Sequence, residues 1–390
     1  MTARPSILIS GGGIGGLAAA IALAGRSFDV QLVERAEQFS EVGAGLQLGA
    51  NAVRRLDALG VAPHLEAKVC QPRGIRVFDA MSGRLLTVLP LGSWARERYG
   101  GPYWCAHRRD LHDALLRRAR ELANLVITSG WPVDDVGLGG GRVRIAAPGG
   151  REIVGDALII AEGVWSENRE MVAAGARPRF CGKTASRTLI APEDLPEAFG
   201  EPYVNIWLSR DVHVVHYPVR AGALVNVVII ANDDWRERNW SKAGDRGALE
   251  RVLSGLAPNL RLLAAAAPSW LRWPLYQMAP LERWSNGVVA LLGDAAHPVL
   301  PFLAQGAALA IEDAVVLGDA LDRGRERIGA ALEHYEAQRR PRARWLQEAS
   351  RRNGEIYHMS GIARRARNAV LAAMAPSRLM ARYDWVYTGR

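Results

Sequence analysis

The 390-residue sequence contains only three cysteines, and they lie far apart along the chain, at Cys70, Cys105 and Cys181. Their spacing matches neither a disulfide framework nor a metal site, so we expect a reducing compartment and no bound metal. The chain also lacks an apolar run long enough to cross a membrane, and we expect no membrane partner. The first residues lead directly into a predicted strand, which indicates no secretory leader and a cytoplasmic location.

Basic residues are in modest excess over acidic ones. The chain has 49 lysines and arginines against 40 aspartates and glutamates, a net charge of +9. Adjacent arginines are dispersed along predicted helices, at 54–55, 117–118, 339–340 and 364–365. Dispersed charge indicates solvated helix faces, so we expect no nucleic-acid partner. A basic surface can still attract anionic substrates such as carboxylates.

The N-terminal residues form a strand–turn–helix–strand pattern around a glycine cluster. Residues 6–10 are an apolar run typical of a buried parallel strand. Gly11, Gly13 and Gly16 follow with the spacing of a dinucleotide-binding turn, and residues 17–24 read as a helix of small side chains. A second strand at 29–33 ends before Glu34. The pattern predicts a Rossmann-like unit that binds either NAD or FAD.

The residues of this turn have separate expected tasks. One glycine makes the tight turn, one lets a pyrophosphate approach the backbone, and one lets the helix pack on the strand. The helix that begins near Ile14 offers unpaired N–H groups to the phosphates. Glu34 is expected to accept hydrogen bonds from ribose hydroxyls, and the adjacent Arg35 is expected to lie at the same cofactor.

A second glycine-containing loop follows another apolar strand near the end of the chain. Residues 288–292 lead directly into Gly293 and Asp294. A carboxylate at the end of a buried strand needs hydrogen-bond donors, and a ribityl or ribose hydroxyl would supply them. After a loop containing Pro301, a predicted helix begins near Gly306 and Ala307. Its N-terminus could face a cofactor ring that gains negative charge on reduction.

The segments between the two loops differ in character. Residues 74–79 and 85–89 are predicted to pair, and residues 178–275 are dominated by strand-like runs typical of an antiparallel sheet. We therefore expect a discontinuous organisation of the chain. The predicted segments are a first dinucleotide-binding part at 1–177, an inserted sheet at 178–275 that covers the substrate, a second dinucleotide-binding part at 276–350 and C-terminal helices at 351–390.

Beyond this reading of the residues, nearly the whole chain resembles the group A flavoprotein aromatic hydroxylases. The resemblance rests on the second FAD motif of that family, which is similar to Leu292 to Pro298, Pro301 to Ala307 and Ile311 to Ala314. Residues 353–358 and 383–387 resemble the branch with salicylate hydroxylases and 3-hydroxybenzoate 6-hydroxylases. The resemblance implies an α/β protein with the para-hydroxybenzoate hydroxylase-like fold.

The resemblance also implies FAD as the cofactor and NADH or NADPH as the electron donor. The implied reaction uses O₂, through a C4a-hydroperoxyflavin, to hydroxylate a phenolic or heteroaromatic carboxylate. A homodimer is one open alternative for the assembly. Two other functions also stay open: a degenerate flavin-binding protein, and an NAD-dependent dehydrogenase, which would leave the second loop without a task.

The resemblance assigns further residues to FAD. Gly45, Leu46 and Gln47 are similar to the flavin loop on the substrate side, and Arg108 to the flavin-contacting arginine of an Arg-x-x-Leu segment. The complete set of expected cofactor residues is Gly11, Gly13, Ile14, Gly16, Glu34, Arg35, Gly45, Leu46, Gln47, Arg108, Glu162, Asp294, Pro301, Gly306 and Ala307.

Three residues are predicted to serve the chemistry. In the strand at 212–219, a period of two places His213 and Tyr217 on one face and His216 on the other. The resemblance puts the substrate against one face of this sheet, so we expect His213 to activate the phenol and Tyr217 to orient the substrate. Gln305 occupies a position where the family has a polar side chain near the flavin or the substrate. The alternative reading of each is a hydrogen-bonded structural residue.

Four positions depart from the family pattern. In the motif that contacts both FAD and NAD(P)H, Ile160 replaces glycine, Glu162 replaces aspartate, and Asn168 replaces an apolar residue. Ser186 stands where the family usually has tryptophan, which could enlarge a cavity. We expect FAD to bind because both main loops are intact. Reduction of the cofactor by NAD(P)H is the step that these substitutions are expected to affect most.

Overall fold

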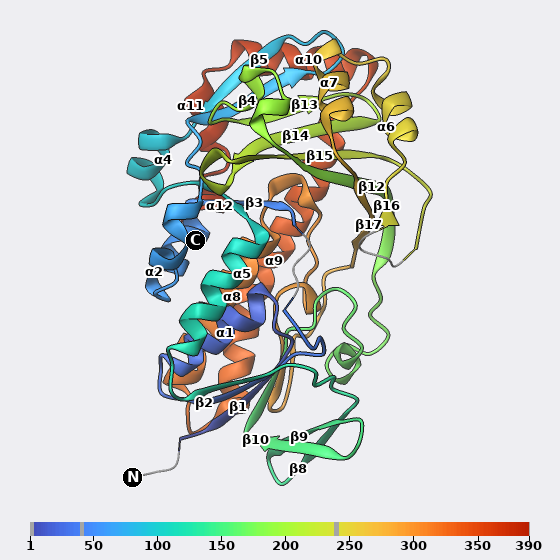
Figure 1. Cartoon of the computed structure of the whole chain (residues 1–390). Helices are drawn as coiled ribbons and strands as arrows, with labels where there is room; N and C mark the ends of the chain where they lie inside the picture. The colour runs from blue at the N-terminus through green and yellow to red at the C-terminus, as the bar shows by residue number, and fades with distance from the viewer. Residues whose placement is uncertain (1–3, 40–42, 238–241, 390) are drawn as a thin grey trace.

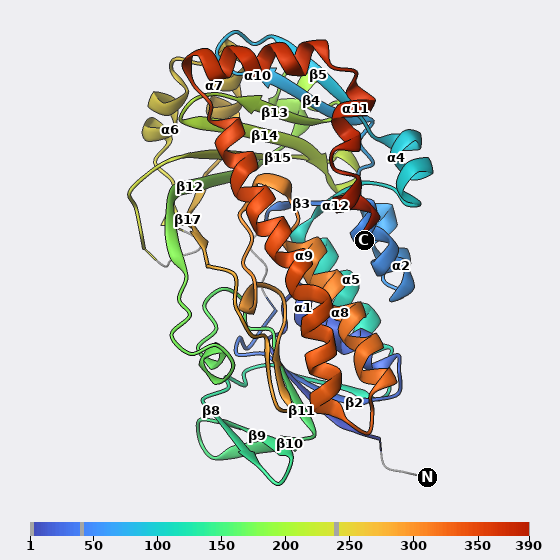
Figure 2. The ribbon, with the colours of Figure 1, turned by 180° about the vertical axis from the view of Figure 1, so that it is seen from behind.

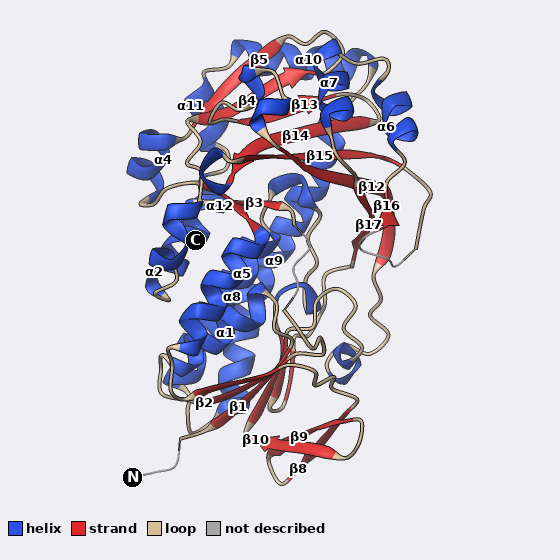
Figure 3. Cartoon of the chain, in the orientation of Figure 1, coloured by secondary structure: helices blue, strands red, loops and turns tan. Residues whose placement is uncertain are grey.

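The computed structural model describes residues 4–39, 43–237 and 242–389. Two large sheets lie at opposite ends of the molecule, and a group of helices packs between them (Figures 1 and 3). The expected α/β architecture is confirmed. Within the described residues, no helix is both long enough and apolar enough to cross a membrane.

The six-stranded sheet contains the N-terminal strand and is parallel except at one edge. Its order is β18-β19-β11-β1-β2-β7, with the short β18 antiparallel to β19. Its strands are β1 (Ser6–Ser10), β2 (Asp29–Val33), β7 (Leu125–Thr128), β11 (Ala157–Ile160), β18 (Ser285–Asn286) and β19 (Val289–Leu291). Since β19 pairs with β11, residues near 290 rejoin a sheet that the first part of the chain began.

Four long helices pack beside the six-stranded sheet and form most of this half of the molecule. They are α1 (Ile14–Ala24), α5 (Arg108–Arg120), α8 (Gly306–Arg323) and α9 (Ile328–Tyr357). Helix α1 is almost entirely buried because its alanines and glycines let α8 and α5 approach closely. Figure 2 shows α9 running from the six-stranded sheet toward the other sheet, and it continues past the boundary expected at residue 350.

The eight-stranded sheet forms the other end of the molecule. Its order is β16-β17-β12-β15-β14-β13-β4-β5, and every pair is antiparallel except β13 with β4. Its strands are β4 (Gly74–Asp79), β5 (Leu85–Pro90), β12 (Arg179–Ile190), β13 (Val204–Leu208), β14 (Val212–Val219), β15 (Leu224–Asn232), β16 (Lys242–Ala243) and β17 (Leu271–Gln277). The hairpin at 74–90 therefore belongs to this sheet, which corrects its expected place within the FAD-binding segment 1–177.

Shorter elements complete both halves. The remaining helices are α2 (Ala50–Ala58), α3 (Ala62–Leu65), α4 (Gly92–Tyr99), α6 (Arg246–Leu253), α7 (Pro258–Ala266), α10 (Gly361–Ala373), α11 (Pro376–Ala381) and α12 (Asp384–Thr388). The remaining strands are β3 (Gly45–Leu48), which pairs with β6 (Trp104–His107), and the set β8 (Asp135–Gly139), β9 (Arg142–Ala147) and β10 (Arg151–Gly155). Figure 2 shows α10 crossing the end of the molecule beside the eight-stranded sheet.

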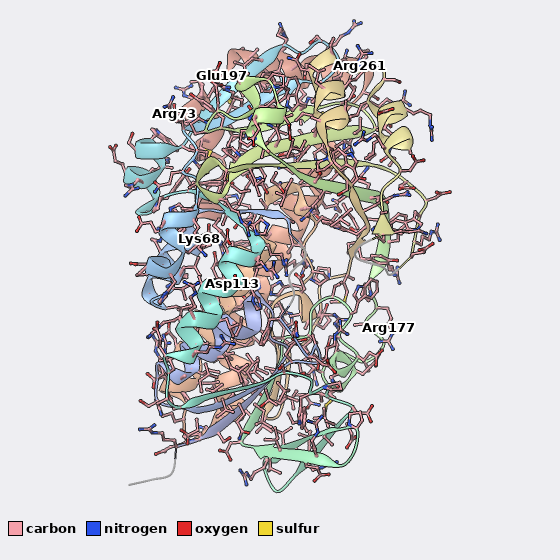
Figure 4. The ribbon with its side chains drawn as sticks, viewed as in Figure 1. Lys68, Arg73, Asp113, Arg177, Glu197 and Arg261 are labelled. Carbon is pink, nitrogen blue, oxygen red and sulfur yellow. The ribbon has the colours of Figure 1, made fainter. Side chains whose placement is uncertain are left out.

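Charged side chains are spread over the surface of both halves. Figure 4 labels Arg73, Arg177 and Arg261 at widely separated places, and all three are exposed. At these three positions the basic side chains lie on solvated faces of the molecule. Of the arginine pairs expected on solvated helix faces, Arg117 and Arg365 are exposed. Arg339 is buried, which corrects the expectation at that position.

Candidate active site

One cavity of about 1090 Å³ lies between the two sheets and receives residues from both. Its volume is slightly above the usual range of about 300–1,000 Å³ for small-molecule pockets. One wall contains the glycine loop and the start of α8, and the opposite wall is a face of the eight-stranded sheet. The cavity therefore has space for a cofactor and a second small molecule together.

The glycine loop between β1 and α1 has the shape that a pyrophosphate needs. A Cβ atom at Gly11 would come 2.4 Å from the Ala161 carbonyl oxygen, and one at Gly16 would come 1.8 Å from the Gly11 carbonyl oxygen. Nothing lies within 4 Å of a Cβ at Gly13, which faces the cavity together with Ile14. Two glycines thus allow close packing, and the third leaves room beside the uncapped N-terminus of α1.

The other residues expected on the adenosine side divide into two groups. Arg35 lines the cavity, whereas the Glu34 carboxylate accepts hydrogen bonds from the backbone N–H groups of Gly12 at 2.7 Å and Ala36 at 3.0 Å. Glu34 lies outside the described cavity lining, as do Gly11 and Gly16. In this structure Glu34 holds the glycine turn in place.

Strand β3 and the start of α5 bring further expected residues to the cavity. Gly45, Leu46, Gln47 and Arg108 all line it. A side chain at Gly45 would collide with Asn226 and Tyr217, since its Cβ would lie 2.6 and 2.7 Å from their atoms. Glycine is needed here because β3 lies directly against the eight-stranded sheet.

The second loop places an acid and a helix N-terminus on the same wall. Asp294, Pro301, Gly306 and Ala307 line the cavity, and no side chain caps the first N–H groups of α8. Asp294 is exposed to the cavity yet surrounded by protein. Shielding from bulk water raises the pKa of its carboxyl, and the nearby His297, Arg108 and Arg169 act in the opposite direction. These groups fit the flavin half of FAD, with N–H donors available to a ring that gains negative charge.

Gln305 is placed differently from the expectation that it touches flavin or substrate. Its side chain is 1% exposed, and its Oε1 accepts a hydrogen bond from Asn51 Nδ2 at 3.0 Å. It does not belong to the described lining of the cavity. Because the amide is turned toward α2, we assign it the loop-stabilising alternative.

The face of β14 that meets the cavity is the one expected from the alternation of its side chains. His213, Val215 and Tyr217 line the cavity. The His216 ring packs against Phe199 on the other side of the sheet, with 5.0 Å between the two ring centroids. Tyr217 is 3% exposed, and burial raises the pKa of its hydroxyl. Tyr217 is therefore a neutral hydrogen-bonding group at neutral pH.

His213 is paired with a second histidine from the end of α9. Its Nδ1 lies 2.8 Å from Nε2 of His358, although the two residues are 145 positions apart. Burial, with His358 and Lys183 nearby, lowers the pKa of His213 well below its ordinary value. Burial also lowers the pKa of His358, to about 4. Both rings are neutral at neutral pH, and Nε2 of His213 remains to meet a ligand.

Two departures from the family pattern contact each other. The Glu162 carboxylate accepts hydrogen bonds from Asn168 Nδ2 at 2.8 Å and Ser166 Oγ at 2.7 Å, and also from Ser10 Oγ. The longer acid is thus held by an amide that the usual apolar residue could not supply. Ile160, the third departure, is fully buried in β11.

Ser186, where the family usually has tryptophan, lies on the face of β12 that is turned away from the cavity. It is 5% exposed on β12 and does not belong to the described cavity lining. Its neighbour Arg187 points to the other face of the strand and does line the cavity. No role was assigned to Arg187 or His358 from the sequence, although His358 ends the segment 353–358 that resembles the family branch and Arg187 follows Ser186. Arg187 could have been found from the alternation of β12.

Comparison with known proteins agrees with this geometry. Residues 4–350 match the family described as FAD binding domain. The chain is 35% identical to a 3-hydroxybenzoate 6-hydroxylase of Polaromonas naphthalenivorans, over 98% of this chain and 95% of that protein.

Two solved structures share the fold over nearly the whole chain. HpxO of Klebsiella pneumoniae with FAD and uric acid superposes with a TM-score of 0.87 at 27% identity, covering 98% of this chain and 96% of that one. A salicylate hydroxylase substrate complex gives a TM-score of 0.84 at 27% identity, with 99% and 96% covered. These matches favour FAD over the NAD-dependent dehydrogenase alternative. The cavity, its two loops and these similarities together identify the chain as a member of the FAD-dependent aromatic hydroxylase family.

Proposed function

We propose that this protein uses NADH or NADPH and O₂ to hydroxylate a phenolic or heteroaromatic carboxylate. One observation carries the proposal: His213 and Tyr217 line the same cavity as the glycine loop and the N-terminus of α8. The names of the relatives support this substrate class, since they include a 3-hydroxybenzoate 6-hydroxylase and a salicylate hydroxylase in complex with its substrate. FAD, when bound, supplies the electron transfer and oxygen activation that side chains cannot provide.

The protein's own residues prepare the substrate. When Nδ1 of His213 donates its hydrogen to His358, Nε2 of His213 is left as an acceptor for the substrate hydroxyl. Withdrawing the phenolic proton makes the ring richer in electrons and therefore more reactive toward an electrophilic oxygen. Tyr217, four residues further along the strand and on the same face, can donate a hydrogen bond that fixes the orientation of the ring.

The surrounding residues control charge and water. The uncapped N-terminus of α8 and the cavity-facing Asp294 would hold the polar edge of the flavin and its ribityl chain. Apolar side chains of the sheet line much of the opposite wall, including Val215, Val228 and Ile230. Such a wall limits the access of water to the reacting atoms.

An NAD(P)H oxidation assay on the FAD-loaded protein tests the proposal. We expect hydroxybenzoates or hydroxynicotinates to stimulate oxidation and to yield a hydroxylated product. In His213→Gln, product formation should fall by roughly 10²–10⁴-fold while FAD remains bound, because the proton acceptor is lost. A bound flavin that neither NADH nor NADPH reduces would instead support the degenerate flavin-binding alternative.

A further inference from the structure

Arg187 presents a charged group to the cavity without a partner for its charge. In the described parts of the chain, no carboxylate forms an ion pair with its guanidinium, and its Nε is buried without a hydrogen-bond partner. Among the buried arginines, Arg339 is paired with Glu312 and Asp313. Arg169 and Arg367 instead donate to backbone carbonyl or side-chain amide oxygens. Arg187 has neither kind of partner at its buried Nε. Arg187 is half-buried and lines the cavity, where an unpaired cation is costly, so we look for its missing partner in a group that enters with a ligand.

The guanidinium is held in place from one side. Its central carbon lies 4.0 Å from the centroid of the Trp273 ring on the neighbouring strand β17. Burial lowers the pKa of Arg187 to about 10, so the side chain keeps its charge at neutral pH. A fixed planar cation with open N–H groups matches the two oxygens of a carboxylate.

The register of the sheet places Arg187 beside the predicted substrate position. Arg187 pairs with Val228 on β15, and Val228 pairs with Val215 on β14. Arg187 therefore lies two strand spacings of about 4.8 Å from Val215, on the same face. His213 and Tyr217 flank Val215 at two residues on either side. One aromatic ring above Val228 and Val215 could reach all three polar side chains.

The cofactor's phosphates have a separate place. The glycine loop and the N-terminus of α1 lie on the opposite wall, where Arg35 also lines the cavity. The position of Arg187 on the sheet, between Trp273 and the His213 strand, points to the second small molecule in the cavity.

We propose that Arg187 anchors the carboxylate of the aromatic substrate while His213 meets its hydroxyl. This assignment rests on the proposed function and adds to it the group that selects acids over neutral phenols. The N–H groups of Arg187 donate to the carboxylate oxygens, and Trp273 keeps the guanidinium plane in place.

Ligand binding to the oxidised, FAD-loaded protein tests the anchor without any turnover. The ligands are salicylate, 3-hydroxybenzoate and 6-hydroxynicotinate, each paired with its neutral amide, and the flavin absorbance reports binding. For acids that the wild type binds, we expect Arg187→Gln to raise Kd by about 10- to 100-fold, as loss of a charged hydrogen bond predicts. The Kd of the neutral amides should change less than threefold. Arg187→Lys should recover part of the loss.

A matched control and clear contrary results complete the test. Arg210→Gln removes a positive charge from an exposed site in the turn between β13 and β14 and should leave every Kd unchanged. The anchor is overturned if Arg187→Gln weakens acid and amide equally, if it affects neither, or if the wild type prefers the amide in every pair. An altered KM for NADPH with unchanged acid binding also overturns it. A protein that anchors the acid but forms no product would contradict the proposed reaction and leave the anchor standing.

Discussion

The buried pair of His213 and His358 connects the active site to the pH dependence of stability. In the folded protein burial holds the pKa of His358 at about 4 and that of His213 well below its ordinary value. The unfolded chain takes up protons near pH 6.5, so the unfolded state binds more protons below that pH. The stability that the two neutral histidines contribute is therefore fully present above about pH 6.5, and it is lost as the pH falls toward their folded-state pKa values.

Replacing His358 with glutamine removes one titrating group from this balance. We expect the free energy of unfolding of His358→Gln to depend less on pH between about 6.5 and 4.5, by up to about 1.4 kcal/mol per pH unit. Urea unfolding followed by tryptophan fluorescence measures this slope. The exposed His334→Gln is the control and should leave the slope unchanged. If the free energy of unfolding depended on pH equally in the wild type and in His358→Gln, the lowered pKa of His358 would be contradicted.

The contact between Glu162 and Asn168 predicts that their substitutions are not additive. Asn168→Leu removes the 2.8 Å hydrogen bond, and Glu162→Asp shortens the acid that receives it. Each single variant should weaken FAD binding. The double variant should lose less binding free energy than the two single variants lose together, by a coupling energy of roughly 0.5–2 kcal/mol. Titration of the FAD-free protein with FAD measures all four Kd values. Strictly additive losses of binding free energy would show that the two departures are independent. The control is Asn259→Leu on the exposed face of α7, which should leave the Kd for FAD unchanged.

At the scale of single residues, local motifs predicted placement better than role. The sequence placed Gly13, Arg108 and Asp294 at the cofactor, and all three line the cavity. Gln305 was expected there and is instead bonded to Asn51. Arg187 and His358 acquire their contacts only when distant strands and helices meet, so their neighbours in the sequence do not reveal which residues they face.

At the scale of elements, helices α8 and α9 are joined by a buried ionic network. Arg339 donates to Glu312 at 2.8 Å and to Asp313 at 2.6 Å, and all three side chains are almost fully buried. Asp313 also lies 2.6 Å from His297 Nε2, which gives that histidine a structural contact. The network fixes α8, whose N-terminus faces the cavity.

Removing the shared cation of this network should be strongly destabilising. Arg339→Met leaves the buried carboxylates short of a partner, and we expect a loss of about 3–5 kcal/mol in the free energy of unfolding. Denaturant unfolding of the FAD-free protein measures it without the contribution of the cofactor. Arg344→Met, an exposed site on the same helix, should change stability by less than about 0.5 kcal/mol. Equal effects of the two substitutions would contradict a structural role for the network.

Element boundaries were largely predictable, but the partners of the strands were not. Apolar alternation located β14 at residues 212–219, and the strand-rich stretch expected at 178–275 contains β12, β13 and β15. It could not reveal that β4 pairs in parallel with β13, about 130 positions later, because period-two patterns carry no information on neighbours. For this reason the hairpin at 74–90 was expected in the other half of the molecule.

At the scale of the whole molecule, the cavity joins what two separate halves provide. The parallel sheet and its helices carry the cofactor loops, and the eight-stranded sheet carries His213, Tyr217 and Arg187. Each half alone lacks part of the machinery for the proposed reaction. The resemblance to a known family predicted this combination, whereas composition and periodicity predicted only that both sheets exist.

The most direct test of the account is the origin of the oxygen atom in the product. FAD-loaded protein would be supplied with NADH or NADPH, 3-hydroxybenzoate and isotopically labelled O₂, with mass spectrometry of the product. The account predicts one labelled oxygen on the ring, the second oxygen atom leaving as water as the nicotinamide is oxidised. An unlabelled product, or electron-donor consumption that yields only hydrogen peroxide across the substrate panel, would contradict it.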